Sequence, residues 1–214
     1  NAGYGEIAHW EPFVEGYIRY VRRTMAPPFQ TVEARKAVAF LMGLAAHGLQ
    51  DAIFDTLFLV QTEMRDGVGQ DATDEGTDAF LSTDGYLRFT PEVYVPYETV
   101  IDVLHENHGH DVEQATIQLG MERVKFFVID SFEALAESFD EMYRPLMPWG
   151  SQHYLDPTIP GSLLSEVPAT ARYIEAIWDR LHGRFPVRAH VVYAYPSEGR
   201  RLLGRDANHV DSWV

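Results

Sequence analysis

The sequence predicts an all-α protein, a helical bundle followed by an irregular C-terminal extension that contains one strand candidate. Two observations carry this prediction. Apolar residues recur at helical spacing through most of residues 1–143. From residue 144 onward the chain becomes rich in Pro and Gly, a composition typical of irregular connections. We therefore divide the chain into a helical domain, residues 1–143, and a C-terminal extension, residues 144–214.

The first two helices are predicted from their caps and their apolar spacing. EPFVEGYIRYVRRTM, residues 11–25, has helical periodicity and places Pro12 in the first turn, where proline is tolerated. MAPPFQ then ends this helix. Thr31 is a good N-cap, with Glu33 close behind it, for a second helix that runs without a strong breaker to about Met64.

Three further segments complete the predicted helical domain. Residues 65–85 are dense in Gly, Asp and Thr, so we expect a loop with at most short helical pieces. VPYETVIDVLHENHG predicts a helix that stops at Gly109, because glycine suits a helix C-terminus. Asp111 is then expected to cap a long helix that runs to about Tyr143.

The last third of the chain contains one predicted helix, residues 168–184. VRAHVVYAY, residues 187–195, is rich in Val and Tyr and is the best strand candidate. A single strand is not stable alone, so it pairs with another chain, pairs with a segment absent here, or is not a strand. The region after Arg144 is therefore expected to be a poorly covered extension that relies on a neighbour.

Composition limits the classes of partner. The chain has 214 residues, a formal net charge of -15 and no cysteine. So much negative charge argues against binding to nucleic acid or to an anionic lipid surface, whereas a zwitterionic lipid or a small neutral ligand remains compatible. Without thiolates, a metal site must use His, Asp and Glu. We expect no membrane span and find no signal peptide in NAGYGEIAHW. Asn1 in place of an initiator Met suggests that an upstream segment was removed or never included.

The second predicted helix carries an unusual set of ionisable residues. Residues 41–58, LMGLAAHGLQDAIFDTLF, are apolar on nearly every side and still contain His47, Asp51 and Asp55. Residues four apart lie on nearly the same helix face, so these three form a stripe of potential metal ligands. Their desolvation would be costly without a cation or a hydrogen-bond network, and we expect His47 to be buried. The alternative is a solvated face that carries the two aspartates, with His47 hydrogen-bonded in the core.

Further candidate ligands lie outside this helix. His9 stands at the entry of the first helix, where a side chain can be aimed inward, although a surface or capping histidine is an equal alternative. The acidic stretch QDATDEGTD offers Asp71, Asp74 and Asp78, some of which are expected to be solvated.

A histidine cluster in LHENHGHD is not assigned to a site. His105, His108 and His110 fall at a helix end near Gly109, where the helix dipole favours histidine. No matching carboxylate motif follows them.

Taken together, AHWEPF, AVAFLMGLAAHGLQD, GQDATDEGTD and VYVPYETVIDVL resemble, in order and spacing, the zinc-dependent phospholipase C family. The likeness is to the amino-terminal catalytic domain of glycosylphosphatidylinositol-specific phospholipases D, with P1-type nucleases more distant, and it covers roughly residues 8–143. The residues that carry it are His9, Trp10, Pro12, Phe13, Ala39, Phe40, Leu41, Gly43, His47 and Asp51, with an acidic turn at residues 69–78.

The resemblance implies a phospholipase C/P1 nuclease-like helical bundle around a cluster of zinc ions. It implies hydrolysis of a phosphodiester in a phospholipid or lipid-anchor substrate, and a secreted protein, extracellular or periplasmic. The family's ligand roles fall on His9, His47 and Asp51. Asp51 is the catalytic candidate, placed to bridge two ions that polarise the phosphate and activate a water.

The sequence departs from the family pattern in its ligands. Asp55 stands where the family has a second histidine, four residues after the aspartate. Gln70 or Asp71 stands where the family has a further histidine, before the acidic turn, and Asp74 matches the family's carboxylate four positions on. The expected metal ligands are therefore His9, His47, Asp51, Asp55 and Asp74. Carboxylates in place of imidazoles shift the preference from zinc toward Mn, Mg or Ca. The family also takes ligands from a segment upstream of its histidine-tryptophan motif. Either a missing segment or another chain completes the domain, or this chain has lost part of the metal site.

Two functions follow from this sequence. The first is a metal-dependent phosphodiester hydrolase of the phospholipase C/D kind. The second is a catalytically impaired family member that serves as a scaffold or partner-binding module with a residual metal site. An upstream segment that carries the remaining ligands would favour the enzyme.

Overall fold

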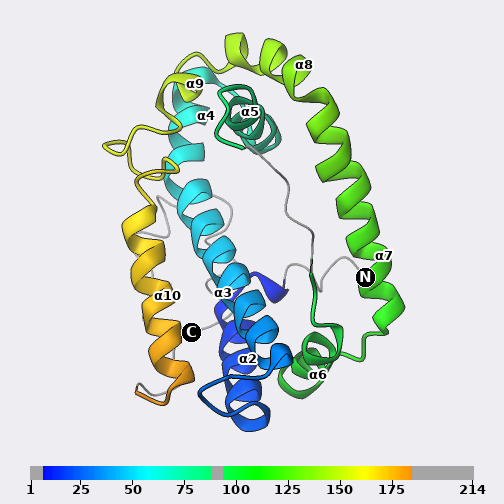
Figure 1. The fold of residues 1–214 in the computed structure, drawn as a ribbon. Helices are drawn as coiled ribbons and strands as arrows, with labels where there is room; N and C mark the ends of the chain where they lie inside the picture. The colour runs from blue at the N-terminus through cyan, green and yellow to red at the C-terminus, as the bar shows by residue number, and fades with distance from the viewer. Residues whose placement is uncertain (1–6, 88–93, 185–214) are drawn as a thin grey trace.

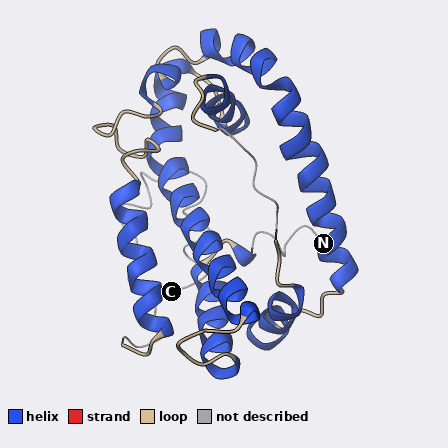
Figure 2. Cartoon of the chain, viewed as in Figure 1, coloured by secondary structure: helices blue, strands red, loops and turns tan. Residues whose placement is uncertain are grey.

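The structure is a computed structural model that describes residues 7–87 and 94–184, and all of its regular elements within these ranges are helices (Figures 1 and 2). The all-α prediction is confirmed, and the strand candidate at residues 187–195 lies outside the described residues. Two of the elements, η1 and η2, are π-helices. The element bounds are α2 Glu11–Thr24, α3 Val32–Ile53, η1 Phe54–Leu59, α4 Val60–Asp66, α5 Gln70–Thr83, α6 Tyr97–His108, α7 Gln114–Arg123, η2 Val124–Asp130, α8 Ser131–Leu146, α9 Gly150–His153 and α10 Val167–Leu181.

The long central helix forms as predicted. Thr31 is its N-cap and accepts a hydrogen bond from the backbone N–H of Ala34 at 3.1 Å. From there α3, η1 and α4 continue as one helical rod over Val32–Asp66. The rod ends at Gly67, whose φ of 75° is the left-handed conformation that suits glycine after a helix.

This rod is also long and apolar enough to cross a membrane by length and composition. Its 35 residues contain an 18-residue window with a mean hydropathy of 1.4. The sequence-based expectation that no segment would reach this level is therefore wrong. The rod packs against α2 and α10 and buries Leu41, Ala45 and Leu49 there, and a core helix meets the same criterion.

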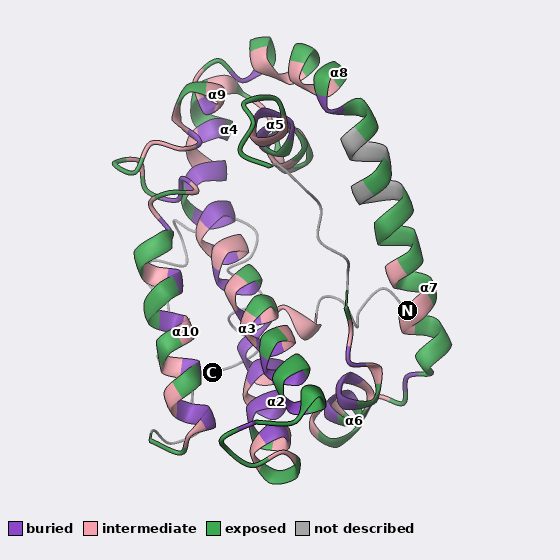
Figure 3. Ribbon diagram, in the orientation of Figure 1, coloured by how far each residue is buried: buried purple, intermediate pink, exposed green. Residues whose placement is uncertain are grey.

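The main hydrophobic core lies where α2, α3, α6 and α10 meet (Figures 1 and 3). From α2 it takes Phe13 and Tyr17, and from α10 it takes Tyr173, Ile177 and Leu181, all at most 1% exposed. Burial of large apolar side chains is the main favourable term in folding. The boundary at residue 143 stays a prediction, although α10, which follows it, contributes to the same core as α2.

The prediction of a loop over residues 65–85 is wrong, because α5 forms there. Thr73, Gly76 and Phe80 of α5 are buried, and α5 packs along α8. A Cβ at Gly76 would lie 2.7 Å from the Met147 sulfur and 3.1 Å from the Tyr143 Cβ, so a larger residue there would force these side chains to shift. Tertiary packing therefore stabilises a helix that residue composition alone disfavours.

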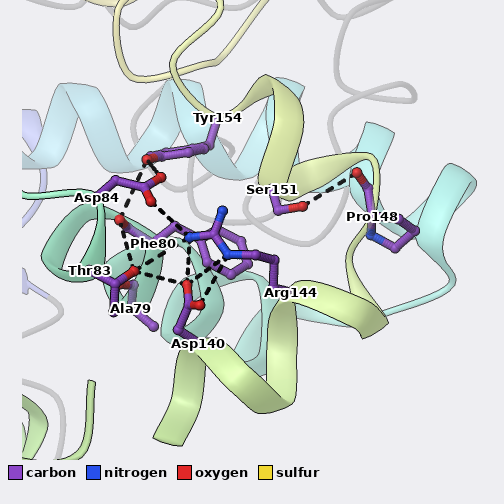
Figure 4. A network of polar contacts seen from close by, with 9 residues as sticks. All are labelled: Ala79, Phe80, Thr83, Asp84, Asp140, Arg144, Pro148, Ser151 and Tyr154. Atoms are coloured by element: carbon purple, nitrogen blue, oxygen red, sulfur yellow. Dashed lines mark hydrogen bonds and ion pairs between the residues drawn. The ribbon is translucent and has the colours of Figure 1, made fainter. Parts of the chain in front are cut away.

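A polar network also holds α5 in place (Figure 4). Arg144 of α8 donates to Asp140 at 2.6 Å and to Asp84, just after α5, at 3.0 Å. The Tyr154 hydroxyl donates to the other oxygen of Asp84 at 2.6 Å. Thr83 donates to Asp140 at 2.9 Å. These contacts fix α5 against α8 and against the turn that follows α9.

The segment that follows α6, which comprises α7, η2 and α8, forms a long arm (Figure 1). Gly109, with a φ of 64°, ends α6 as predicted, but the next helix begins at Gln114 with Glu113 as its N-cap rather than Asp111. The arm then runs through α7, η2 and α8 to Leu146. No residue of α7 is buried in the described structure (Figure 3), so this stretch contributes little to the core.

A glycine joins the segment before α10 to the central rod. Gly161 has a φ of 81°, and a Cβ there would lie 2.5 Å from the Phe58 backbone nitrogen and 2.7 Å from Leu57 Cβ. The Gln61 side chain donates to the carbonyl of Pro160 at 3.1 Å, beside this contact. The chain therefore enters α10 pressed directly against the π-helix η1.

We expect Gly161→Ala to lower the free energy of unfolding by about 2–4 kcal/mol, because left-handed strain and a clash with backbone act together. Denaturant unfolding followed by circular dichroism measures this change. Gly67→Ala is the matched control, since Gly67 has a similar φ of 75° with open space around its Cβ position. Equal losses in the two variants would contradict the close approach at Gly161.

Candidate functional site

A pocket of about 350 Å³ opens between α3, α5 and the segment that leads into α10. We call it the acidic pocket, because four carboxylates and one imidazole, but no Lys or Arg, lie among the lining residues that the structure describes. The described residues that line it are His47, Gln50, Asp51, Phe54, Asp74, Thr77, Asp78, Leu81, Leu163 and Glu166.

The α3 side of the pocket carries His47 and Asp51. They are four residues apart, so the helix presents them one turn apart on the same face, as the sequence predicts. The expectation that His47 would be buried is wrong, because the residue is exposed at the wall of an open pocket rather than in the core. Desolvation of the ring still lowers the pKa of His47, against the opposing effect of Asp51 and with a smaller lowering by His9. The imidazole is therefore neutral at pH 7, the form that binds a metal ion.

His9 approaches this pair from the turn before α2. Its Nε2 atom lies 3.0 Å from Nε2 of His47. A buried contact helps to fix the turn, since Glu11 accepts hydrogen bonds from Arg180 at 2.9 Å and from the Tyr173 hydroxyl. Both partners belong to α10, so the start of α2 is tied to that helix.

The α5 side of the pocket carries Asp74 and Asp78, which lie one turn apart. Asp71, the third aspartate of the acidic stretch, is exposed and is not a lining residue. Because α5 is a helix rather than the predicted loop, it presents two carboxylates from one face to His47 and Asp51.

Asp55 lies outside the lining of the acidic pocket, although it was predicted to continue the stripe of His47 and Asp51. The π-helix η1 begins at Phe54, and its wider i to i+5 turns shift the following side chains around the axis. Asp55 is buried and accepts a hydrogen bond from the side chain of Gln70 at 3.1 Å. Its role as a metal ligand stays a prediction.

Glu166 was not identified from the sequence. It is 1% exposed, and neither of its carboxylate oxygens has a hydrogen-bond partner among the described residues. Burial, and then the charge of Asp51, raise the pKa of Glu166 to about 8. No local pattern in SLLSEVP distinguishes this residue from a solvated glutamate at a helix start, because its burial comes from distant segments.

The histidine cluster stays apart from the pocket lining. His105 Nδ1 lies 2.7 Å from Asp111 on the surface, and the His108 ring stacks on Phe13 with a centroid distance of 6.1 Å. These contacts agree with the sequence-based decision not to assign the cluster to a site.

The donor types of the acidic pocket fit a divalent metal ion. Two zinc ligands at about 2.0–2.1 Å from one ion can lie 3.0 Å apart, the separation of the His9 and His47 nitrogens. Glu166 adds a carboxylate whose oxygens lack protein donors. Among the described residues, however, no three His, Asp or Glu side chains are gathered closely enough to hold one ion. The donors therefore line a common pocket without converging on a single point.

Comparison with known proteins gives one distant relative. The phosphatidylinositol-glycan-specific phospholipase D of Bos taurus is 26% identical over 118 residues, which is half of this chain and 14% of that protein. The chain thus spans about one seventh of the length of this relative. No family model and no solved structure matches the chain. The match supports a distant relationship to a protein named as a phospholipase.

Proposed function

From this relationship and the acidic pocket, we propose that the chain forms part of a metal-dependent phosphodiester hydrolase that acts on phospholipid or lipid-anchor substrates. The observation that carries the proposal is that residues from distant segments of the chain lie at one pocket. His9, His47, Asp51 and Asp74, four of the five ligands predicted by resemblance, lie at or beside one pocket.

The charge of the pocket supports dependence on a metal. A phosphodiester is an anion, and the described residues of the pocket lining offer it four carboxylates and no Lys or Arg. Coulomb repulsion would exclude such a substrate unless bound cations reversed the local charge. Bound divalent ions would also polarise the phosphate and activate a water, which is the chemistry that two-metal hydrolases use.

Each protein group has a definable task in this proposal. His9 and His47 supply imidazole nitrogens. Asp51, on the α3 side of the pocket one helical turn from His47, is the candidate to bridge two ions. Asp74 supplies an oxygen ligand from α5.

The size of the pocket supports a lipid headgroup as the bound portion. A volume of about 350 Å³ is near the lower end of the usual range for ligand pockets. A phosphodiester with a small polar group fills such a space, whereas acyl chains do not fit. Phe54, Leu81 and Leu163 give part of the lining an apolar surface for the start of the lipid.

Hydrolysis of vesicles tests this function. The purified chain, stripped with EDTA and reloaded with Zn²⁺ or Mn²⁺, is incubated with phosphatidylcholine or phosphatidylinositol vesicles. Diacylglycerol as the product indicates C-type cleavage, and phosphatidic acid indicates D-type cleavage. We expect one of them to form with metal and neither to form in EDTA, and intact lipid in every metal-loaded sample would contradict the proposal.

The second candidate function, a partner-binding module with a residual metal site, is supported by the arm. Leu119, Val124 and Phe126 of α7 and η2 are between 42% and 61% exposed, and α7 has no buried residue. Exposed large apolar residues of this kind are typical of interaction surfaces. Metal binding without lipid hydrolysis in the same assay would favour this candidate.

A further inference from the structure

We propose that Glu166, contributed from the start of α10, is an additional metal ligand of the acidic pocket. The inference rests on the proposed metal centre and extends it to a residue that neither the resemblance nor the sequence pattern identified. The ligand class is a divalent cation that accepts oxygen donors.

The first argument is the burial of Glu166. The residue is 1% exposed and lines the acidic pocket, and both carboxylate oxygens lack hydrogen-bond partners among the described residues. Buried carboxylates are normally hydrogen-bonded, paired with a cation or bound to a metal. Glu166 has neither of the first two within the described structure, and a metal ion would supply the missing partner.

Glu166 takes neither of two ordinary structural roles of a glutamate at a helix start, which are capping the helix and pairing with a cation. Glu166 stands at the N-terminus of α10, but its side chain makes no capping hydrogen bond there. The buried cation on the same helix, Arg180, is 14 residues away, which is about 21 Å along the axis. Arg180 is paired with Glu11 at 2.9 Å, so it does not neutralise Glu166.

The surroundings of Glu166 favour a cation. Asp51, Asp74 and Asp78 line the same pocket, and the charge of Asp51 acts directly on Glu166. Four ionised carboxylates from three parts of the chain repel one another, and a positive ion between them would relieve this repulsion. An oxygen-rich set of this kind suits Mn²⁺, Mg²⁺ or Ca²⁺ as well as Zn²⁺.

The backbone before α10 holds Glu166 in place. Gly161 is pressed against η1, and Ser162 is fully buried, with its hydroxyl donating to the Asp156 carbonyl at 2.5 Å. The Glu166 N–H in turn donates to the Ser162 carbonyl at 3.3 Å. The backbone that carries Glu166 is therefore fixed, and a rigid support of this kind is what a metal site requires.

Direct metal titration tests the inference. The affinities of the purified chain for Mn²⁺ and Zn²⁺ are measured by calorimetry for the wild type, Glu166→Gln and Glu166→Asp. We expect Glu166→Gln to weaken binding by at least about tenfold, with a correspondingly smaller metal-induced rise in the melting temperature. Glu175→Gln, an exposed glutamate on the same helix, is the matched control and should keep the wild-type affinity.

The outcomes separate this inference from the proposed function. If the wild type binds metal and Glu166→Gln binds it equally well, Glu166 is a buried protonated acid and the inference is overturned, while the metal centre stands. If the wild type binds neither ion, the metal centre and the inference both fail. Should Glu166→Gln lack a cooperative melting transition, the metal affinity of Glu166→Asp tests the inference instead. This variant keeps the charge and withdraws the oxygens by one methylene, so an unchanged affinity would overturn the inference.

Discussion

Replacing Asp51 with asparagine is expected to weaken the binding of Zn²⁺ or Mn²⁺ by more than about 100-fold and to abolish lipid hydrolysis. Loss of a residue that only supports a ligand already costs about 10–100-fold, so loss of a central ligand costs more. Asn keeps the shape of Asp and removes its charge, which two neighbouring cations would need. Calorimetric titration of the variant measures the affinity, and the vesicle assay measures the activity.

The control for Asp51→Asn is Asp111→Asn. Asp111 is exposed and pairs with His105 on the surface, where an ion pair contributes little to stability. This variant should keep both metal affinity and activity. If Asp51→Asn retained an affinity within threefold of the wild type, Asp51 would be a residue of a solvated face and the inherited metal site would be absent.

Arg180→Met is expected to lower the free energy of unfolding by about 3–5 kcal/mol, because it leaves the carboxylate of Glu11 buried without its cation. Both partners of this ion pair are only 4% exposed at their side chains. Burial already raises the pKa of Glu11 to about 7, although Arg180 and the Tyr173 hydroxyl both favour its charged form. Urea unfolding at pH 8, followed by circular dichroism, measures the loss.

Two comparisons make the result for Arg180 specific. Arg184→Met removes an exposed partner of Asp179 and should change the free energy of unfolding by less than about 1 kcal/mol. The double variant Glu11→Leu with Arg180→Met removes both buried charges and should recover part of the loss. A cost of less than 1 kcal/mol for Arg180→Met alone would mean that the start of α2 is not held by this pair.

Local signals in the sequence were sufficient to predict most helix ends. Thr31 caps α3 through its own side chain, and Gly109 ends α6 in the left-handed conformation that glycine adopts readily. These are interactions between residues at most a few positions apart, so they can be read from spacing. The helix over residues 70–83 was missed because its Gly, Asp and Thr content disfavours a helix until α8 packs against it.

The candidate site divides in the same way. The sequence by itself determined that His47 and Asp51 share one helix face, since four residues make about one turn. Only the tertiary structure decided that Asp55 leaves this face at the π-helix, that His9 lies 3.0 Å from His47, and that Glu166 is buried beside them. Helical periodicity relates neighbours along one helix, whereas burial and the meeting of His9 with His47 depend on how segments distant in the chain pack together.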